Sequence, residues 1–246
     1  MLHPTSLFRN FIALPALLVV LGGIVKVQGD TFFVDLSADG AGTGTSWRDA
    51  FSTLQDGLFE RKEGDVIYVA EGTYYPDEAK VAPVVDNDRS SSFQLKSGVE
   101  IYGGFPRGGG DPSKRDPGRY RVTLSGDLQQ DDATNPSGSV NNAYRVVIGS
   151  FTKGNTILDG FYITGGNADS VNGAFSGGGM FNDQGELTIR NCTFTGNNAR
   201  ANGGAIANRF ASPVIEDCRF FCNTANSGGA ISNERESGMD LSLIHI

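Results

Sequence analysis

Three aspartates that lie close together in the sequence are the strongest candidates for ion chemistry. Asp127, Asp131 and Asp132 fall in a polar segment that follows the apolar run 122–124. Hard cations such as calcium take several oxygen ligands from flexible segments of this kind. A calcium site is therefore a candidate there, but a solvated loop is the favoured interpretation, because the spacing fits no strict calcium-loop motif. The Asp-Asn-Asp segment 86–88 is a weaker candidate.

Histidine content and net charge exclude several classes of function. The two histidines, His3 and His245, lie near the ends of the chain. The sequence between them thus lacks a histidine general base, a Ser-His-Asp triad and a histidine metal site. The formal net charge is −8. Such an acidic surface argues against binding to nucleic acid or to anionic membranes.

The elements that would position these residues follow from a repeated pattern between residues 177 and 233. Gly-Gly-Ala-Ile-Ala-Asn at 203–208 returns as Gly-Gly-Ala-Ile-Ser-Asn at 228–233, and Gly-Gly-Gly-Met-Phe-Asn at 177–182 is a weaker copy. Ile-Arg-Asn-Cys-Thr-Phe at 189–194 returns as Ile-Glu-Asp-Cys-Arg-Phe at 215–220. The shifts are 25 or 26 residues. A fixed period in this range indicates stacked units, each too thin to bury its own core.

The repeat unit favours short strands over helices. Glycine pairs, asparagine and threonine interrupt each apolar run after a few residues. The period would fit either a leucine-rich repeat or a coil of a β-helix, but no segment within it has a helical pattern. We therefore predict an all-β chain coiled into parallel sheets. Equivalent residues then stack about 4.8 Å apart. Ile206 and Ile231 should form one such buried stack.

Cysteine and asparagine recur at fixed places in the same repeat. Cys192 and Cys218 share a column, where either a disulfide or two stacked buried thiols would fit. Cys222 follows the strand and should lie nearer the surface. Asn197 and Asn223 form another column, in which side-chain amides can hydrogen-bond along the stack. Asn167 is a third member in this interpretation, although it lies one residue later.

The chain before the repeat predicts one helix and several strands. A helix is expected over 46–62, capped by Ser46, because Trp47, Phe51, Leu54 and Leu58 recur at helical spacing. It would cover the open apolar end of the first coil. The strands are expected at 31–35, 66–69, 99–102, 122–124, 144–148 and 156–163. The long polar insertions are expected at 76–92, 106–120, 129–142 and 168–176.

These motifs resemble known repeat proteins. Gly-Gly-Ala-Ile and Phe-x-x-Asn (194–197 and 220–223) resemble the repeats of polymorphic outer-membrane proteins. The segments 65–75, 101–105, 124–127 and 158–161 resemble secreted bacterial proteins with the pectin-lyase-like fold. The two resemblances together cover most of 33–233. They imply a right-handed parallel β-helix (a solenoid) behind an N-terminal capping helix.

The two ends of the sequence predict segments outside this domain. Arg9, the apolar run 11–25 and the residues before Gly29 are typical of a secretory signal peptide over 1–29. The β-helix domain would then span 30–240. The tail 241–246 does not continue the repeat and resembles the translation of a sequencing adapter, so we expect the domain to be truncated at its C-terminal end.

The function implied is that of an exported, monomeric scaffold at the cell surface or outside the cell. We expect it to bind polysaccharide or another surface glycan without catalysis. A calcium-assisted polysaccharide lyase is the alternative, because lyases of this fold can use Lys or Arg as base. Lys153, Arg145 and Arg209 are the candidates for that role, although ordinary exposed charges explain them equally well. A purely structural passenger is the third possibility.

Overall fold

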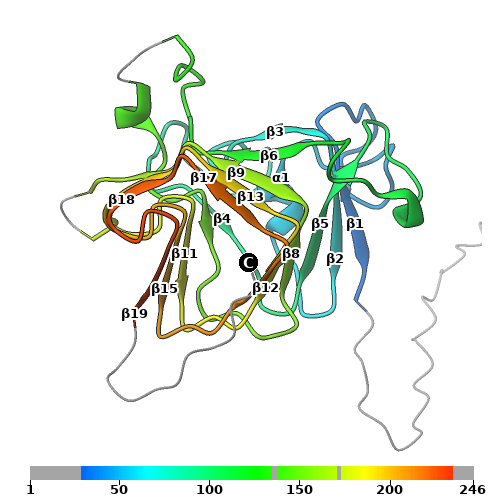
Figure 1. The fold of residues 1–246 in the computed structure, drawn as a ribbon. Coiled ribbons are helices and arrows are strands. Elements are labelled where there is room, and N and C mark those ends of the chain that lie inside the picture. The colour runs from blue at the N-terminus through cyan, green and yellow to red at the C-terminus, as the bar shows by residue number, and fades with distance from the viewer. Residues whose placement is uncertain (1–28, 135–137, 171–172, 235–246) are drawn as a thin grey trace, which may run out of the picture.

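The computed structural model describes residues 29–134, 138–170 and 173–234, and most of its regular structure is short β-strand (Figure 1). Neighbouring strands pair in parallel throughout this part of the chain. The prediction of an all-β chain with parallel sheets is therefore confirmed. The predicted signal peptide, apart from residue 29, and the predicted tail 241–246 lie outside the described residues.

The strands form four sheets, which we name A to D. Sheet A contains, in spatial order, β1 (Thr31–Val34), β2 (Val66–Ala70), β5 (Glu100–Phe105), β8 (Ile157–Asp159), β12 (Thr188–Arg190) and β16 (Val214–Glu216). Sheet B contains β3 (Gly72–Tyr74), β6 (Val122–Ser125), β9 (Phe161–Thr164), β13 (Thr193–Thr195) and β17 (Arg219–Phe221). Sheet C contains β4 (Phe93–Gln94), β7 (Val147–Ile148), β11 (Met180–Asp183), β15 (Ile206–Arg209) and β19 (Ile231–Glu234). Sheet D contains β10 (Asn167–Ala168), β14 (Asn198–Asn202) and β18 (Thr224–Ser227).

The repeat in the sequence corresponds to a repeated path through these sheets. From β8 onward the chain visits sheets A, B, D and C in the same order three times, and we call each passage a circuit. Each circuit adds one strand to each sheet beside the strand of the circuit before it. Ile189 therefore pairs with Ile215, and Phe194 with Phe220, as the period predicted. Figure 1 shows the same progression as a colour change from blue to red along the stack.

The glycine pairs of the repeat serve the corner between sheets D and C. The first glycine of each pair is left-handed, with φ of 71° at Gly177, 61° at Gly203 and 62° at Gly228. Only glycine adopts this conformation without steric cost. The second glycine serves a close approach, because a Cβ on Gly204 would overlap the carbonyl oxygen of Thr224 in the next circuit. One motif thus meets two separate backbone requirements.

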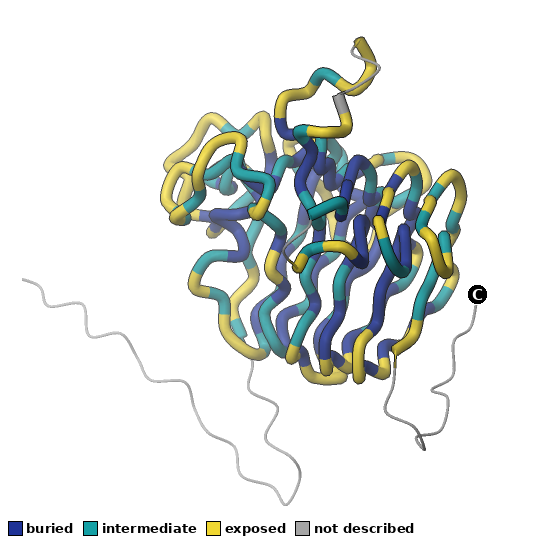
Figure 2. The backbone as a smooth tube through the Cα atoms, turned by 90° about the vertical axis from the view of Figure 1, so that its left-hand side faces the viewer, coloured by how far each residue is buried: buried dark blue, intermediate teal, exposed yellow. Residues whose placement is uncertain are grey.

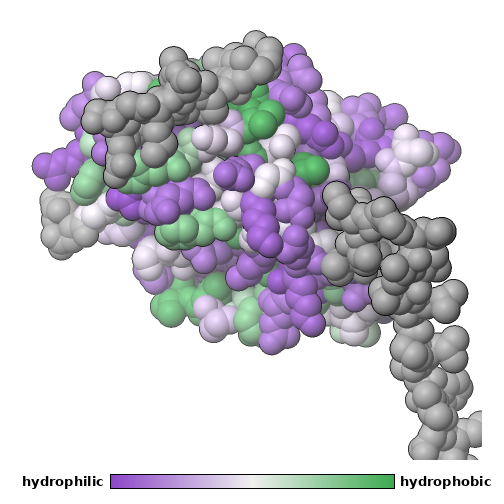
Figure 3. All heavy atoms as spheres, turned by 90° about the horizontal axis from the view of Figure 1, so that it is seen from below, coloured by the Kyte–Doolittle hydropathy of each residue, from purple (hydrophilic) through white to green (hydrophobic). Residues whose placement is uncertain are grey.

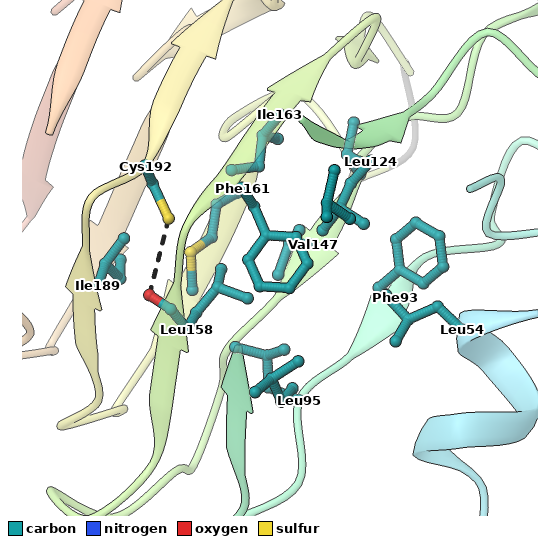
Figure 4. Close-up of a cluster of buried hydrophobic side chains, with 14 of the residues drawn as sticks. Leu54, Phe93, Leu95, Leu124, Val147, Leu158, Phe161, Ile163, Ile189 and Cys192 are labelled. Atoms are coloured by element: carbon teal, nitrogen blue, oxygen red, sulfur yellow. Dashed lines mark hydrogen bonds between the residues drawn. The ribbon is translucent and has the colours of Figure 1, made fainter. Parts of the chain in front are cut away.

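The core lies inside the sheets as stacked columns of apolar side chains. Figure 2 shows buried and more exposed residues recurring together on neighbouring strands. One column is formed by Ile67, Ile101, Leu158, Ile189 and Ile215, each with 0% exposure. Figure 4 shows part of this core between the strands and the helix. Ile206 is buried as predicted, whereas its partner Ile231 on the last strand of sheet C is only half-buried.

The asparagine column is real, but one of its predicted members belongs elsewhere. The Nδ2 of Asn197 donates to Oδ1 of Asn223 at 3.0 Å. Asn167 does not join them: it pairs with Asn198 in sheet D and accepts from its Nδ2 at 2.8 Å. The one-residue offset noted in the sequence therefore places Asn167 in a neighbouring column. A further amide stack in sheet C joins Asn182, Asn208 and Asn233.

The cysteines are free thiols in this structure. Cys192 and Cys218 are buried, and Cys222 is exposed as predicted. The thiol of Cys192 donates to the Leu158 carbonyl at 3.6 Å, as Figure 4 shows, and that of Cys218 to the Glu216 carbonyl at 3.2 Å. Stacked thiols, and not a disulfide, are thus the arrangement seen here.

The helix predicted over 46–62 is wrong in extent. The helix α1 spans only Leu54–Leu58, and the described chain adds two 3-10 turns, η1 (Pro112–Lys114) and η2 (Gly138–Asn141). Thr53 is the N-cap, and its side chain accepts from the amide of Asp56. Phe51 is extended instead, because its backbone amide donates to the Phe33 carbonyl at 2.9 Å beside β1. Backbone pairing with the first strand therefore outweighs the helical spacing of the apolar residues.

Candidate functional site

Sheet A presents a row of outward side chains that differs from the uniform column behind it. The register joins, strand by strand, Phe33, Tyr68, Tyr102, Asp159, Arg190 and Glu216, which we name the outer row. Side chains alternate between the two faces of a strand. The buried residue just before each of the middle members, such as Ile101 before Tyr102, therefore faces the core, and the outer row faces away from it. The row is aromatic on the first strands and charged on the later ones.

The aromatic half of the outer row is held by residues from two loops. The ring centroids of Phe33 and Tyr68 lie 5.9 Å apart, and those of Tyr68 and Tyr102 lie 6.0 Å apart. Trp47 packs on Phe33 at 4.8 Å and on Phe105 at 5.2 Å. Its indole nitrogen donates to the carbonyl of residue 110 at 3.3 Å. Phe33, Tyr68 and Tyr102 are each only partly buried, so part of this aromatic row is accessible to solvent.

The charged half is organised around Asp159, which is 1% exposed. Its carboxylate accepts from Arg115 at 2.5 Å, from Arg190 at 2.6 Å and from Asn191 at 3.0 Å. Burial on its own would raise the pKa of Asp159. The hydrogen bonds from Arg115, Asn191 and Arg190 outweigh burial and hold this pKa below its usual value. Asp159 is therefore an ionised anchor that positions two guanidinium groups at the surface.

Arg115 lies between two shallow hollows of the surface. It comes from the insertion 106–120, and its Nε donates to the carbonyl of Gly103. The first hollow has a volume of about 240 Å³ and is lined by Val66, Tyr68, Glu100, Tyr102, Phe105, Pro112 and Arg115. The second has a volume of about 290 Å³ and is lined by Arg115, Pro117, Gly118, Tyr162, Asn191, Cys192, Thr193, Asp217 and Arg219. The surface beside the outer row therefore combines aromatic rings with hydrogen-bonding groups.

This combination suits a sugar ring. The C–H face of a pyranose can pack on an aromatic ring, and its hydroxyls need donors and acceptors at the rim. Glu100 lies at the rim, where it accepts from the Tyr102 hydroxyl at 2.7 Å. Burial, followed by this hydrogen bond, raises the pKa of Tyr102, so the phenol stays protonated and continues to donate. Arg115 and Arg190 supply further donors beside it.

Two of the three predicted basic residues meet on the outer face of sheet C. Arg145 and Arg209 both contact the ring of Phe181, with guanidinium carbons 3.8 and 5.5 Å from its centroid. Arg209 also pairs with Asp183 at 2.5 Å. Burial, and then the charge of Arg209, lowers the pKa of Arg145 to about 10. Arg145 therefore remains protonated at neutral pH and is unsuited to act as a base.

The third predicted base, Lys153, has a different neighbour. Its ammonium nitrogen lies 2.7 Å from the carboxylate of Glu63, and both side chains are at least half exposed. An exposed pair of this kind contributes little to stability or catalysis. The three basic candidates are thus each engaged in contacts with neighbouring side chains or carbonyl groups.

The three predicted metal ligands are brought together after β6. The carboxylate groups of Asp127, Asp131 and Asp132 lie with ligand atoms within 4.8 Å of one another. The backbone amides of Asp131 and Asp132 donate to Asp127 at 3.0 and 3.3 Å. Burial, and then the neighbouring charges of Asp127 and Asp131, raises the pKa of Asp132. Each of the three carboxylates therefore lies beside the negative charge of the other two.

The weaker acidic segment 86–88 forms a turn. Asp88 accepts from the amide and the hydroxyl of Ser90 at 2.9 and 2.7 Å. The amide of Asn87 donates to Asp77 at 2.9 Å. These contacts account for the carboxylate of Asp88 as part of a local turn.

The sequence interpretation missed the aromatic half of the outer row. One signal was present: Ile-Tyr occurs at both 67–68 and 101–102, within two segments that were expected to form strands. In a parallel sheet the two isoleucines then share the inner face and the two tyrosines the outer face. Trp47 and Arg115 gave no such signal, because loops bring them to the site.

Comparison with known proteins gives no further guide. Neither a family model, nor a curated protein, nor a solved structure matches this chain. Among the described residues, no helix has the length and apolar character needed to cross a membrane.

Proposed function

We propose that this chain is an exported scaffold that binds polysaccharide along the outer row of sheet A without chemical turnover. The single observation that carries the proposal is the half-exposed aromatic surface of Phe33, Tyr68 and Tyr102 beside the charged groups around Asp159. Strands repeat every 4.7–4.9 Å across a sheet. A row perpendicular to the strands therefore suits an extended, regular polymer better than a single small molecule.

The proposed architecture is a right-handed parallel β-helix with an N-terminal cap. The repeated path through four sheets and the resemblance of the sequence motifs support it. The short helix α1 packs against β1 and β2 at the start of the stack. A cap is needed there to shield the apolar side chains of the first strands from solvent. Export is supported by the apolar N-terminal run of the sequence.

Non-catalytic binding is favoured by how the ionisable groups beside the aromatic surface are used. Asp159 is held by two arginines, and Glu100 accepts from Tyr102. A general base must be able to accept a proton from the substrate. The second candidate function, a calcium-assisted lyase, draws on the acidic cluster at Asp127.

Binding and turnover can be separated in one set of measurements. The protein is titrated with soluble neutral and acidic polysaccharides by calorimetry, and Tyr68→Ala and Tyr102→Ala are compared with wild type. Loss of either ring should weaken binding about tenfold, and the double variant should abolish it. Phe151→Ala is the matched control, because Phe151 is 67% exposed on a turn away from the outer row.

On the lower face of the molecule, seen in Figure 3, hydrophobic residues are scattered among hydrophilic ones.

Three outcomes would overturn this proposal. Unchanged affinity in the double tyrosine variant would move binding off sheet A. An ultraviolet-absorbing unsaturated product, formed with calcium and lost with chelator, would establish a lyase instead. Absence of binding to every polysaccharide would leave the structural passenger as the remaining interpretation.

A further inference from the structure

One guanidinium group on the outer face of sheet C is partly desolvated and has no acidic partner. Arg145 donates from Nε to the carbonyl of Ser176 at 3.1 Å, and its Nη2 lies 3.5 Å from the carbonyl of Gly173. Among the described residues no carboxylate pairs with Arg145, and no group accepts from its Nη1. A cation that has lost water and gained no opposite charge is costly, and an anion from outside the chain would offset that cost.

Arg145 opens onto a hollow that contains a second guanidinium group. The hollow has a volume of about 260 Å³, and its lining includes Arg145, Phe175, Phe181, Asn202, Arg209 and Glu234. Strand β11, which carries Phe181, pairs with β7 on one side and with β15 on the other, and Figure 1 shows β11 beside β15. Arg145 lies just before β7, and Arg209 ends β15. The two guanidinium groups therefore reach the ring of Phe181 from the two neighbouring strands.

Acidic neighbours limit a ligand of this hollow to a single negative charge. The hydrogen bond to Asp183, and to a smaller extent the charge of Glu234, raises the pKa of Arg209. The charge of Arg209 is thus largely balanced within the chain, and Arg145 supplies the positive charge that remains available. A phosphate monoester carries nearly two negative charges at neutral pH, so a monoanion fits this balance better.

We propose that this hollow binds a sulfate ester group carried by a sugar. A sulfate ester is a monoanion whose three terminal oxygens point in different directions, so it can accept from Arg145 and Arg209 together. A carboxylate has two oxygens in one plane and matches a single guanidinium fork. A guanidinium group is weakly hydrated, and a sulfate ester holds its water less tightly than a carboxylate. The pair therefore loses less hydration when it forms.

The wall of the hollow offers an apolar surface for the sugar ring. Phe175 is 44% exposed there, and the C–H face of a pyranose can pack on an aromatic ring. The choice of a sugar as the carrier rests on the proposed function. The anion site itself lies on sheet C and does not depend on the outer row of sheet A.

The test is an NMR titration of the full chain with glucose 6-sulfate, glucuronate and glucose, followed through the arginine Nε–H signals. Glucose 6-sulfate should bind about tenfold more tightly than glucose and more tightly than glucuronate, and it should shift the signal of Arg145. Its affinity should fall as sodium chloride is added. The double variant Tyr68→Ala, Tyr102→Ala should keep the full affinity for glucose 6-sulfate, because both rings lie on sheet A.

Variants in the hollow should change this affinity in opposite directions. Arg145→Gln should weaken binding of glucose 6-sulfate about tenfold. Arg119→Gln is the matched control, because exposed Arg119 also lies over a ring, that of Tyr120 at 5.2 Å, and its loss changes the net charge equally. Phe175→Ala, at an exposed position, should weaken binding about threefold. Glu234→Gln should strengthen it about threefold, because it removes a negative charge from the rim.

Four results would overturn the proposal. Glucose or glucuronate that binds as tightly as glucose 6-sulfate would remove the sulfate ester as the ligand. Equal losses in Arg145→Gln and Arg119→Gln would show that net charge alone attracts the anion. Unchanged affinity in both Phe175→Ala and Glu234→Gln would move binding out of the hollow, whether or not Arg145→Gln folds. Loss of binding in the double tyrosine variant would place the sulfated sugar on sheet A. Binding in the hollow without any polysaccharide on the outer row would support this site and overturn only the proposed function.

Discussion

The repeat region, 177–234, and the region before it, 31–168, build the same sheets by different means. In the repeat region the glycine corner between sheets D and C and several inward columns, such as Ile189 with Ile215 and Phe194 with Phe220, carry the same residue type in successive circuits. Asn182 donates to Asn208 at 3.3 Å, and Asn208 to Asn233 at 2.8 Å, so one side-chain type satisfies three levels of the stack. In the earlier region long insertions separate the strands, and the outward residues change from one strand to the next.

The difference teaches where stability and ligand chemistry are encoded. A position that recurs in every circuit makes the same kind of contact each time. In this chain, that contact either supplies a hydrogen-bond partner along the stack or fills the core. Behind the outer row, the inner neighbours of Tyr102, Asp159 and Arg190 remain Ile, Leu and Ile. Outward positions are free of that constraint, so an aromatic and a charged half can arise on one sheet. The four predictions that follow test this division, from the largest expected effect to the smallest.

Burying a charge in a periodic column should have the largest effect. Ile206→Asp places a carboxylate at a position with 0% exposure, and we expect a loss of several kcal/mol, about half or more of a typical domain's stability. The same change at Ile231, which is half-buried on the last strand, should cost much less. Urea unfolding followed by circular dichroism measures both. Equal losses would show that the last circuit is packed as tightly as the inner one.

A methyl group on the second glycine of the repeat should come next. Gly204→Ala would bring Cβ against the carbonyl oxygens of Thr224 and Gly229, and overpacking of this kind costs about 1–3 kcal/mol. The matched control is Gly110→Ala in the insertion 106–120, where the nearest atoms to a new Cβ lie 3.5 Å away. Thermal unfolding should lower the midpoint only for Gly204→Ala. A similar shift in both variants would remove the contrast between repeat and insertion.

Interrupting the asparagine stack should cost somewhat less. Asn208→Ala removes the donor to Asn233 and the acceptor for Asn182, and the loss should be about 1–2 kcal/mol. Asn155→Ala, an exposed asparagine whose Nδ2 lies 3.3 Å from Glu63, is the control and should change little. Both are read from the free energy of unfolding. No loss in Asn208→Ala would mean that water replaces the amide stack.

The smallest effect should be a pH dependence from the charged half of the outer row. The pKa of Asp159 is lower in the folded state than in the unfolded chain, because Arg115, Asn191 and Arg190 overcome its burial. Its contribution to stability is therefore complete above the unfolded pKa of about 3.9 and is lost as pH falls through the folded pKa. Asp159→Asn should flatten this part of the curve. Unfolding free energies measured between neutral and acidic pH would contradict the assignment if the two curves had the same slope.

Much of the fold and part of the acidic cluster could be predicted because they depend on local sequence. The shifts of 25 and 26 residues place Ile189 on Ile215, and the strand register agrees. Asp127, Asp131 and Asp132 are close in sequence, so a short loop necessarily keeps them near one another. The single strand expected over 156–163 is in fact β8 and β9, separated by left-handed Gly160 with φ of 87°. The glycine at position 160 therefore marks a corner between sheets A and B.

The sequence by itself determined the period, the parallel pairing and the apolar columns, because these depend on residue types at a fixed separation. The tertiary structure decided the rest. The helix shortened because Phe51 pairs with β1, and the outer row formed because strands 34 and 57 residues apart align Tyr68 with Tyr102 and Tyr102 with Asp159. Trp47 and Arg115 reach it from loops, and Asn142 reaches Asp132 across a bend in the insertion. Such contacts depend on how far each loop extends and where it folds back, and no local pattern of residues records that.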